Sequence, residues 1–107
     1  MSLDVYLKVV KPTDVFDANY THNVTKMADA AGLYGPVWRP DESGIKKAGD
    51  LIAPLRDGIA KMEADPQKFI AMNPENGWGS YETFLPWLKR YLDACEENPQ
   101  ADVEVSR

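Results

Sequence analysis

Hydrophobic and polar residues alternate along the start of the chain, from Ser2 to Val10. The apolar side of this alternation holds Leu3, Val5, Leu7 and Val9. A period of two is typical of a β-strand with one buried face. The last residues repeat the pattern more weakly, and its apolar positions are Ala101, Val103 and Val105. We therefore expect a strand at each end of the chain, and we expect the two to pair as neighbours in one sheet.

Between the two ends, apolar residues recur at spacings of three and four, which predicts helices. The first predicted helix begins at a capping residue, Asp17 or Asn19, and ends near Ala31. Its apolar positions are Tyr20, Val24, Met27, Ala28 and Ala31. A second series runs from Ile45 to Met62, and Pro54 within it predicts a kink or a new start near Asp50.

Two further helices are predicted in the second half of the chain. Asp65 followed by Pro66 opens a short one, because proline is favoured at the first helical position. Ser80 caps the last helix, Pro86 interrupts it, and Asn98 precedes the proline that ends it. Its apolar positions are Tyr81, Phe84, Leu85, Leu88, Leu92 and Cys95. We expect an α+β fold in which three to four helices pack with a small sheet formed by the N- and C-terminal strands, in a single domain of residues 1–107.

Composition narrows the function classes. The formal charge is −5, from 12 basic and 17 acidic residues, and the basic residues form no stripe that could neutralise a duplex, so we expect no duplex nucleic acid as partner. The N-terminus lacks the pattern of a signal peptide, and no apolar run approaches the ~20 residues of a membrane span. We expect a cytoplasmic protein with no membrane partner.

The chain has one cysteine, Cys95, and one histidine, His22, so a disulfide within the chain and a cysteine-based zinc site are excluded. Cys95 lies on the apolar side of the last helix and is expected in the core. The carboxylates Asp4, Glu75 and Glu82 have no spacing that pairs two of them for acid–base chemistry. We predict no catalytic residue, no metal site and no cofactor.

The segment from Asn73 to Tyr81 is the strongest candidate for binding. It places Trp78 between Gly77 and Gly79, which allow positive φ angles and a close approach of backbone. An indole beside carboxamides and free N–H groups can grip a ligand with a planar part. The alternative is structural: Trp78 fills the core, and the asparagines at 73 and 76 hold the turn by bonding their own backbone.

Two other segments combine aromatic and polar residues. Tyr20-Thr21-His22-Asn23 opens the first predicted helix, where free N–H groups could receive an anion or a carbonyl. Trp38-Arg39-Pro40 offers a stacking face beside a bidentate donor for carboxylate or phosphate. The alternatives are that Tyr20 and Trp38 belong to the core, that His22 makes an ordinary polar contact, and that Arg39 pairs with a surface carboxylate.

Five segments together resemble a family of small, compact proteins that bacteriophages and prophages encode widely. They are Ser2-Leu3-Asp4-Val5-Tyr6-Leu7, Thr21-His22-Asn23, Trp38-Arg39-Pro40, Asn73-Pro74-Glu75-Asn76-Gly77-Trp78-Gly79 and Val105-Ser106-Arg107. The resemblance spans the chain and implies a phage context, but it assigns no activity and no catalytic residue. Small phage proteins often counter host defences, and some sequester nucleotide-derived signals such as cyclic ADP-ribose variants or cyclic oligonucleotides.

We expect a non-enzymatic, homo-oligomeric binding protein in the host cytoplasm that captures a small nucleotide-like ligand. The expected ligand-binding residues are His22, Asn23, Trp38, Arg39, Asn73, Asn76, Trp78 and Tyr81. In this hypothesis the two tryptophans and Tyr81 stack on the ligand, Arg39 holds phosphate, and the other residues donate or accept hydrogen bonds. One alternative is a protein-interaction module that inhibits a host protein through the same aromatic residues. Another is a small nucleotide-processing enzyme with His22 or Glu75 as its base.

Overall fold

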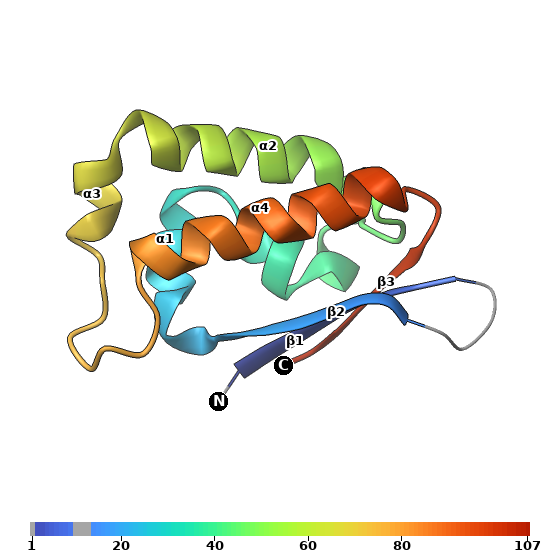
Figure 1. Cartoon of the computed structure of the whole chain (residues 1–107), viewed down its shortest axis with the longest axis horizontal. Helices are drawn as coiled ribbons and strands as arrows, with labels where there is room; N and C mark the ends of the chain where they lie inside the picture. The colour runs from blue at the N-terminus through green and yellow to red at the C-terminus, as the bar shows by residue number, and fades with distance from the viewer. Residues whose placement is uncertain (1, 10–13) are drawn as a thin grey trace.

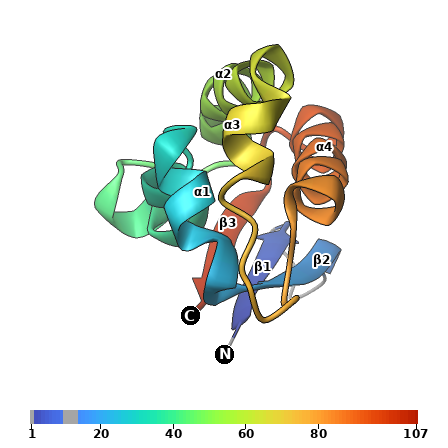
Figure 2. The same ribbon diagram turned by 90° about the vertical axis from the view of Figure 1, so that its left-hand side faces the viewer.

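The computed structural model describes residues 2–9 and 14–107, and in it a three-stranded antiparallel sheet carries the helices on one face (Figures 1 and 2). β1 (Ser2–Lys8) is the central strand, between β2 (Asp14–Thr21) and β3 (Asp102–Ser106). The predicted pairing of the two ends is confirmed, since β1 and β3 are antiparallel neighbours with Val5 opposite Val105. Val10, predicted as part of the first strand, lies outside the described residues.

β2 corrects the first predicted helix, which was wrong at its start. The residues from Asp14 to Thr21 are a strand, and helix begins only at a short 3₁₀ turn, η1 (His22–Val24), followed by α1 (Thr25–Ala30). Phe16, Ala18 and Tyr20 alternate with polar residues, and each is packed against the core. Pairing with β1 satisfies the backbone groups on one side of this edge strand, and its aromatic and β-branched residues suit a half-buried pleated surface.

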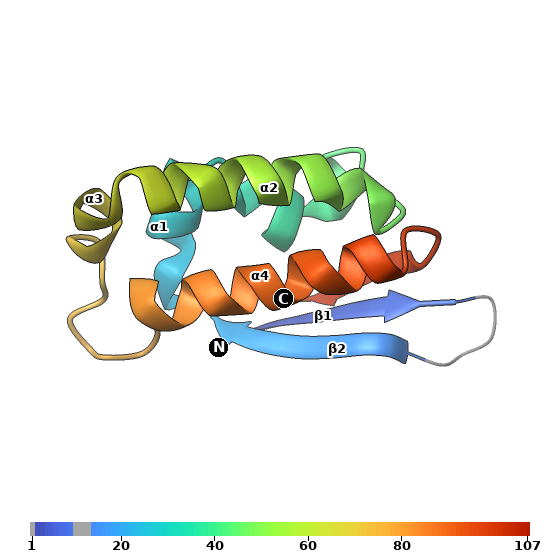
Figure 3. The same cartoon turned by 45° about the horizontal axis from the view of Figure 1, so that its top comes forward.

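The remaining helices follow the predicted order; they are α2 (Gly49–Ala64), α3 (Pro66–Ile70) and α4 (Tyr81–Glu97). Two short turns before them were not predicted: a π-helical turn η2 (Tyr34–Trp38) and a 3₁₀ turn η3 (Pro40–Glu42). The helices α2 and α4 lie side by side above the sheet (Figure 3). This arrangement confirms the α+β class, with a small sheet to which both ends of the chain contribute.

The predicted starts of the later helices are confirmed. The Ser80 hydroxyl accepts the backbone N–H of Thr83 at 3.2 Å and caps α4. Near the start of α2, the Asp50 carboxylate accepts the backbone N–H groups of Lys46 and Lys47, each at 3.1 Å. Pro54 and Pro86 lie within α2 and α4 without ending either helix.

The core is unusually aromatic where α4 covers β2. A continuous series of ring contacts, with centroids 5.2–6.2 Å apart, runs through Phe16, Tyr91, Trp87, Tyr20, Phe84, Trp38 and Tyr34. Trp87 and Tyr91 extend the buried face of α4 beyond the predicted apolar series. Within the described part of the chain, Trp87 Nε1 and the Tyr91 hydroxyl are buried without a hydrogen-bond partner.

Candidate functional site

The segment between α3 and α4 is fixed to the end of β2 by hydrogen bonds. The backbone N–H of Ser80 donates to the Tyr20 hydroxyl at 3.1 Å, and that hydroxyl also lies 2.5 Å from Thr83 Oγ1. Within the segment, the N–H of Trp78 donates to Asn76 Oδ1 at 2.9 Å. Figure 2 shows the segment descending from α3 past the end of β2. These bonds hold the segment in one place relative to the sheet.

Glycine is required at two positions of this segment. Gly77 and Gly79 have φ angles of 75° and 87°, in the left-handed region that favours glycine. A Cβ at Gly79 would lie 2.6 Å from Cγ2 of Thr21, so the backbone here touches the end of β2 directly. A side chain at either position is disfavoured, and Trp78 between them is held outward.

Trp78 projects into solvent, with 68% of its surface exposed. It forms one wall of an open hollow of about 630 Å³, within the size range of small-molecule sites. The other walls come from the ends of β1 and β2, from η1 and from the same segment; they are Ser2, Asn19, Tyr20, Thr21, Asn23 and Asn76. The structure therefore places an exposed ring beside a set of neutral carboxamides and hydroxyls, which we call the Trp78 hollow.

Three of the eight predicted ligand-binding residues line the Trp78 hollow: Asn23, Asn76 and Trp78. Asn76 Nδ2 donates to Asn23 Oδ1 at 3.4 Å, and Asn23 Nδ2 donates to Thr21 Oγ1 at 2.8 Å. Two segments 53 residues apart in the sequence thus meet through their carboxamides. The alternative in which Trp78 fills the core is wrong, because its ring is exposed.

His22 and Trp38 bond to each other. Trp38 Nε1 donates to His22 Nδ1 at 2.9 Å, and the Trp38 ring is only 1% exposed, packed on Phe84 and Tyr34. Because its ring is in the core, Trp38 has no face for a ligand, which corrects its predicted stacking role. The structural alternative for Trp38 is confirmed.

Arg39 is engaged within its own segment. Its Nε donates to the Tyr34 hydroxyl at 3.0 Å, and its Nη1 pairs with Glu42 at 2.9 Å. Both partners raise the pKa of the Arg39 guanidinium, the Tyr34 hydrogen bond contributing most. Arg39 does not line the Trp78 hollow.

Asn73 and Tyr81 bond to the protein at the start of α4. Asn73 Oδ1 accepts the backbone N–H of Tyr81 at 2.7 Å, and its Nδ2 donates to Glu82 at 3.1 Å. The Tyr81 hydroxyl donates to the carbonyl of Met62 at 3.1 Å, which ties α4 to α2. Asn73 thus bonds the backbone of its own segment, as Asn76 does, which confirms this part of the structural alternative. Neither Asn73 nor Tyr81, both predicted to bind ligand, lines the Trp78 hollow.

Sequence reasoning missed Ser2 and Asn19 as site residues. Both point to the uncovered face of the sheet, because each is next in its strand to a residue on the core side: Ser2 to Leu3, and Asn19 to Tyr20. Ser2 pairs with Thr21 and Asn19 with Asp4 across the β1–β2 ladder. One sequence signal could have identified Asn19: Phe16, Ala18 and Tyr20 alternate with polar residues, which predicts a strand. A strand at this position could pair with the first strand and bring Asn19 beside it.

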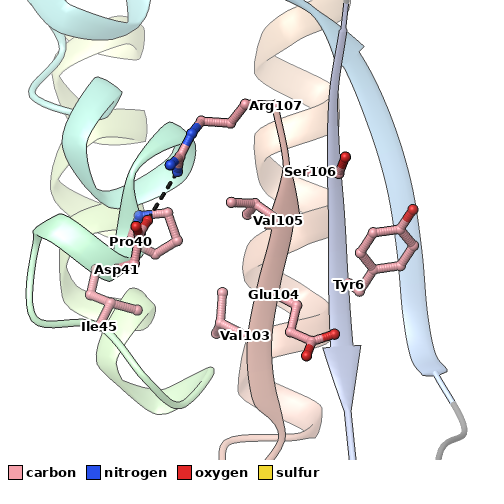
Figure 4. Close-up of a pocket in the computed structure, with 9 residues that line it drawn as sticks. All are labelled: Tyr6, Pro40, Asp41, Ile45, Val103, Glu104, Val105, Ser106 and Arg107. Carbon is pink, nitrogen blue, oxygen red and sulfur yellow. Dashed lines mark hydrogen bonds and ion pairs between the residues drawn. The ribbon is translucent and has the colours of Figure 1, made fainter.

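A second hollow, of about 450 Å³, lies along the outer edge of β3 (Figure 4). Val103 and Val105 face Pro40 and Ile45 across it, and Arg107 spans one end to reach Asp41 at 2.9 Å. That ion pair lowers the pKa of the Asp41 carboxyl. We call this hollow the β3 groove.

Across residues 2–9 and 14–107, no group of three or more His, Cys, Asp or Glu side chains could hold a metal ion. None of the described helices combines the length and apolar composition needed to cross a bilayer. Comparisons with protein-family models, with curated proteins and with solved structures gave no match to this chain.

Proposed function

We propose that this protein captures a small ligand with a flat, nucleobase-like ring, which stacks on Trp78 and is bonded by the carboxamides of the Trp78 hollow. The observation that supports this most directly is the exposure of the Trp78 indole beside Asn23 and Asn76, on a backbone whose N–H bonds to Asn76. Stacking of a base on an aromatic side chain contributes about 1–3 kcal/mol per base. A preformed platform also avoids the entropy of ordering a loop on binding.

The surrounding groups suit capture without turnover. Carboxamides and hydroxyls line the Trp78 hollow together with the indole, and they donate and accept hydrogen bonds without transferring protons near neutral pH. His22, the base of the enzymatic alternative, accepts the Trp38 N–H through Nδ1. We propose that the protein acts by sequestration, in the manner of a phage anti-defence protein that removes a nucleotide-derived immune signal, as a homo-oligomer in the host cytoplasm.

A thermal-shift and tryptophan-fluorescence screen of linear and cyclic nucleotides tests the proposal. A cognate compound at 100 times its Kd should add about 2.7 kcal/mol of stability, a shift of several degrees in Tm. Trp78→Ala should abolish the shift and leave the Tm of the free protein unchanged, since the ring is exposed. Trp78→Phe keeps a smaller stacking face and should retain part of the affinity. No response from any compound in either readout would reject the proposal.

A second candidate function, docking of an extended peptide, is favoured by the open edge of β3. The backbone of Val103 donates to the carbonyl of Lys46 at 3.0 Å, so this edge already pairs with an extended segment of the chain at one end. Along an antiparallel strand, alternate residues direct N–H and C=O to the same side, so Val105 offers both to the β3 groove. Among the described residues, neither group of Val105 has a partner on that side. A docked strand would continue the pairing that Lys46 begins.

Val105→Pro is the specific test of this second candidate. It removes the outward N–H but no bond to β1, because Val105 and Val5 form a non-hydrogen-bonded pair. Val105→Thr keeps the N–H and the β-branch, and serves as the matched control. A host protein captured by the wild type and by Val105→Thr, but lost with Val105→Pro, supports docking at β3. Equal capture by all three places the interaction elsewhere.

A further inference from the structure

The Trp78 hollow contains no cationic side chain among the described residues that line it. The polar residues that line it are all neutral: Ser2, Asn19, Tyr20, Thr21, Asn23 and Asn76. Arg39, expected to hold phosphate, bonds to Tyr34 and Glu42 instead. A phosphate in this hollow would meet neutral donors only, without the charge that ordinarily holds it.

The neighbouring surface is acidic. A smaller hollow of about 240 Å³ shares Asn19 with the Trp78 hollow and is also lined by Asp4 and Asp17. Asn19 lies directly opposite Asp4 in the ladder, on the uncovered face of the sheet. The carboxylates of Asp4 and Asp17 would repel a phosphate bound beside them, and they leave a neutral group unaffected.

Hydrogen bonds within the protein occupy part of the polar lining. Asn76 Oδ1 accepts the Trp78 N–H, and Asn23 bonds through both its oxygen and its nitrogen. Asn19 differs from both: its exposed carboxamide makes no hydrogen bond to any part of the chain that the structure describes. A free carboxamide presents a donor beside an acceptor, the arrangement that reads the edge of a nucleobase in a bidentate contact.

We infer that the site recognises the uncharged base of its ligand, that Asn19 reads the base edge while Trp78 stacks on its face, and that phosphate adds nothing to affinity. This inference rests on the proposed function and narrows it. The triphosphate then binds no more tightly than its nucleoside, and the phosphates point into solvent. A larger nucleotide-derived signal is held by one base, with its charged part outside the hollow.

Isothermal titration with the four ribonucleosides and their triphosphates, each at 50 and 200 mM NaCl, tests the absence of phosphate recognition. For the base that binds, we expect the triphosphate to bind no more tightly than the nucleoside, and to lose no affinity when salt is raised. A triphosphate that binds at least tenfold tighter than its nucleoside, and loses affinity at 200 mM NaCl, would overturn the inference while leaving the proposed function intact. If none of the eight compounds binds, the proposed function fails with it.

The role of Asn19 is tested with the same nucleoside and two variants. Asn19→Ala and Asn19→Thr should each weaken binding about tenfold or more, the loss of one bidentate base contact. Threonine is favoured in strands, so Asn19→Thr still reports the loss of the carboxamide if Asn19→Ala perturbs β2. Ser106→Ala, at the position on β3 that faces Asp4 from the other side, is the control and should bind as the wild type. Wild-type affinity in both Asn19 variants would remove Asn19 from the site.

Discussion

Trp38 Nε1 donates a hydrogen bond to His22 Nδ1, and this bond provides the buried indole with its only polar partner among the described residues. The acceptor must be an unprotonated ring nitrogen, so the His22 tautomer carries its proton on Nε2. The bond joins η1 to η2 through two residues that lie 16 positions apart in the sequence. His22 therefore has a structural role in positioning η2 against the core.

His22→Ala should destabilise the protein by about 1–3 kcal/mol, because it leaves the buried Trp38 N–H without an acceptor. The midpoint of urea unfolding measures the loss. In a Trp38→Phe background there is no N–H to satisfy, so the same substitution should cost much less. Equal costs in the two backgrounds would show that the hydrogen bond adds nothing.

Gly77→Ala and Gly79→Ala form a matched pair. Both place a side chain at positive φ, which costs roughly 1–2 kcal/mol. A Cβ at Gly77 meets open space, whereas one at Gly79 would lie 2.6 Å from Thr21 and 3.0 Å from Val24. Gly79→Ala should therefore lose roughly 1–3 kcal/mol more in chemical unfolding, as overpacking does. Losses of the same size in the two variants would contradict the close contact with β2.

Gly58→Ala should destabilise α2, although alanine is the better helix former by about 1 kcal/mol. A Cβ at Gly58 would lie 2.4–2.6 Å from the side chain of Leu33, which is fully buried. Calorimetric unfolding should give a lower Tm for this variant. Combined with Leu33→Ala, it should cost less than the sum of the single changes, since the second substitution vacates the space. A raised Tm for Gly58→Ala alone would refute the predicted clash.

The Cys95 thiol should be inert in the native protein. Burial raises the pKa of this thiol to about 12, with a further contribution from Glu96, and the side chain is fully buried. At pH 8 only about one thiol in ten thousand is then ionised, and the thiolate is the reactive form. Reaction with a chromogenic disulfide reagent should be slow in buffer and fast in denaturing urea. Rapid labelling of the folded chain would show that α4 opens locally.

Asp50 should make stability depend on pH in the acid range. The backbone N–H groups of Lys47 and Lys46 lower the pKa of the Asp50 carboxyl in the folded state. Its contribution is therefore complete above the ordinary carboxyl pKa of about 4, and it is lost as pH falls through the lower folded value. Asp50→Asn should reduce the fall in the unfolding midpoint between pH 5 and pH 2, because this variant lacks the one proton that the Asp50 carboxyl takes up in that range. Asp57→Asn, on the exposed side of α2, is the control.

Local sequence signals predicted most of the elements. Ser80 and Asp65 with Pro66 mark helix starts, and Asp50 lies in the first turn of α2, because such signals depend only on residues within one turn. β2 was mistaken for helix because Tyr20 fits spacings of both two and four, and a short segment carries too few apolar positions to separate the periods. Pairing with β1 decides between them, and that partner lies outside any local window.

The candidate site was predicted in part. Asn23, Asn76 and Trp78 line one hollow, whereas His22, Trp38 and Arg39 do not line it and bond within the fold. Local sequence cannot tell an indole that fills the core from one that leaves it, because the two environments differ only in what packs around the ring. Asn19 was not predicted as a site residue because its segment was assigned to a helix and not to β2.

The sequence by itself determined the alternation of β1, the helix caps and the two glycines that hold Trp78 outward, since each depends on neighbours along the chain. The tertiary structure decided which tryptophan is exposed, where the asparagines meet, and which carboxamide lacks a partner. Those properties depend on distances between segments such as β2 and the one before α4, which lie about 60 residues apart in the sequence and touch at Ser80 and Tyr20. Burial and hydrogen-bond satisfaction are set by such contacts, and a single local pattern does not encode them.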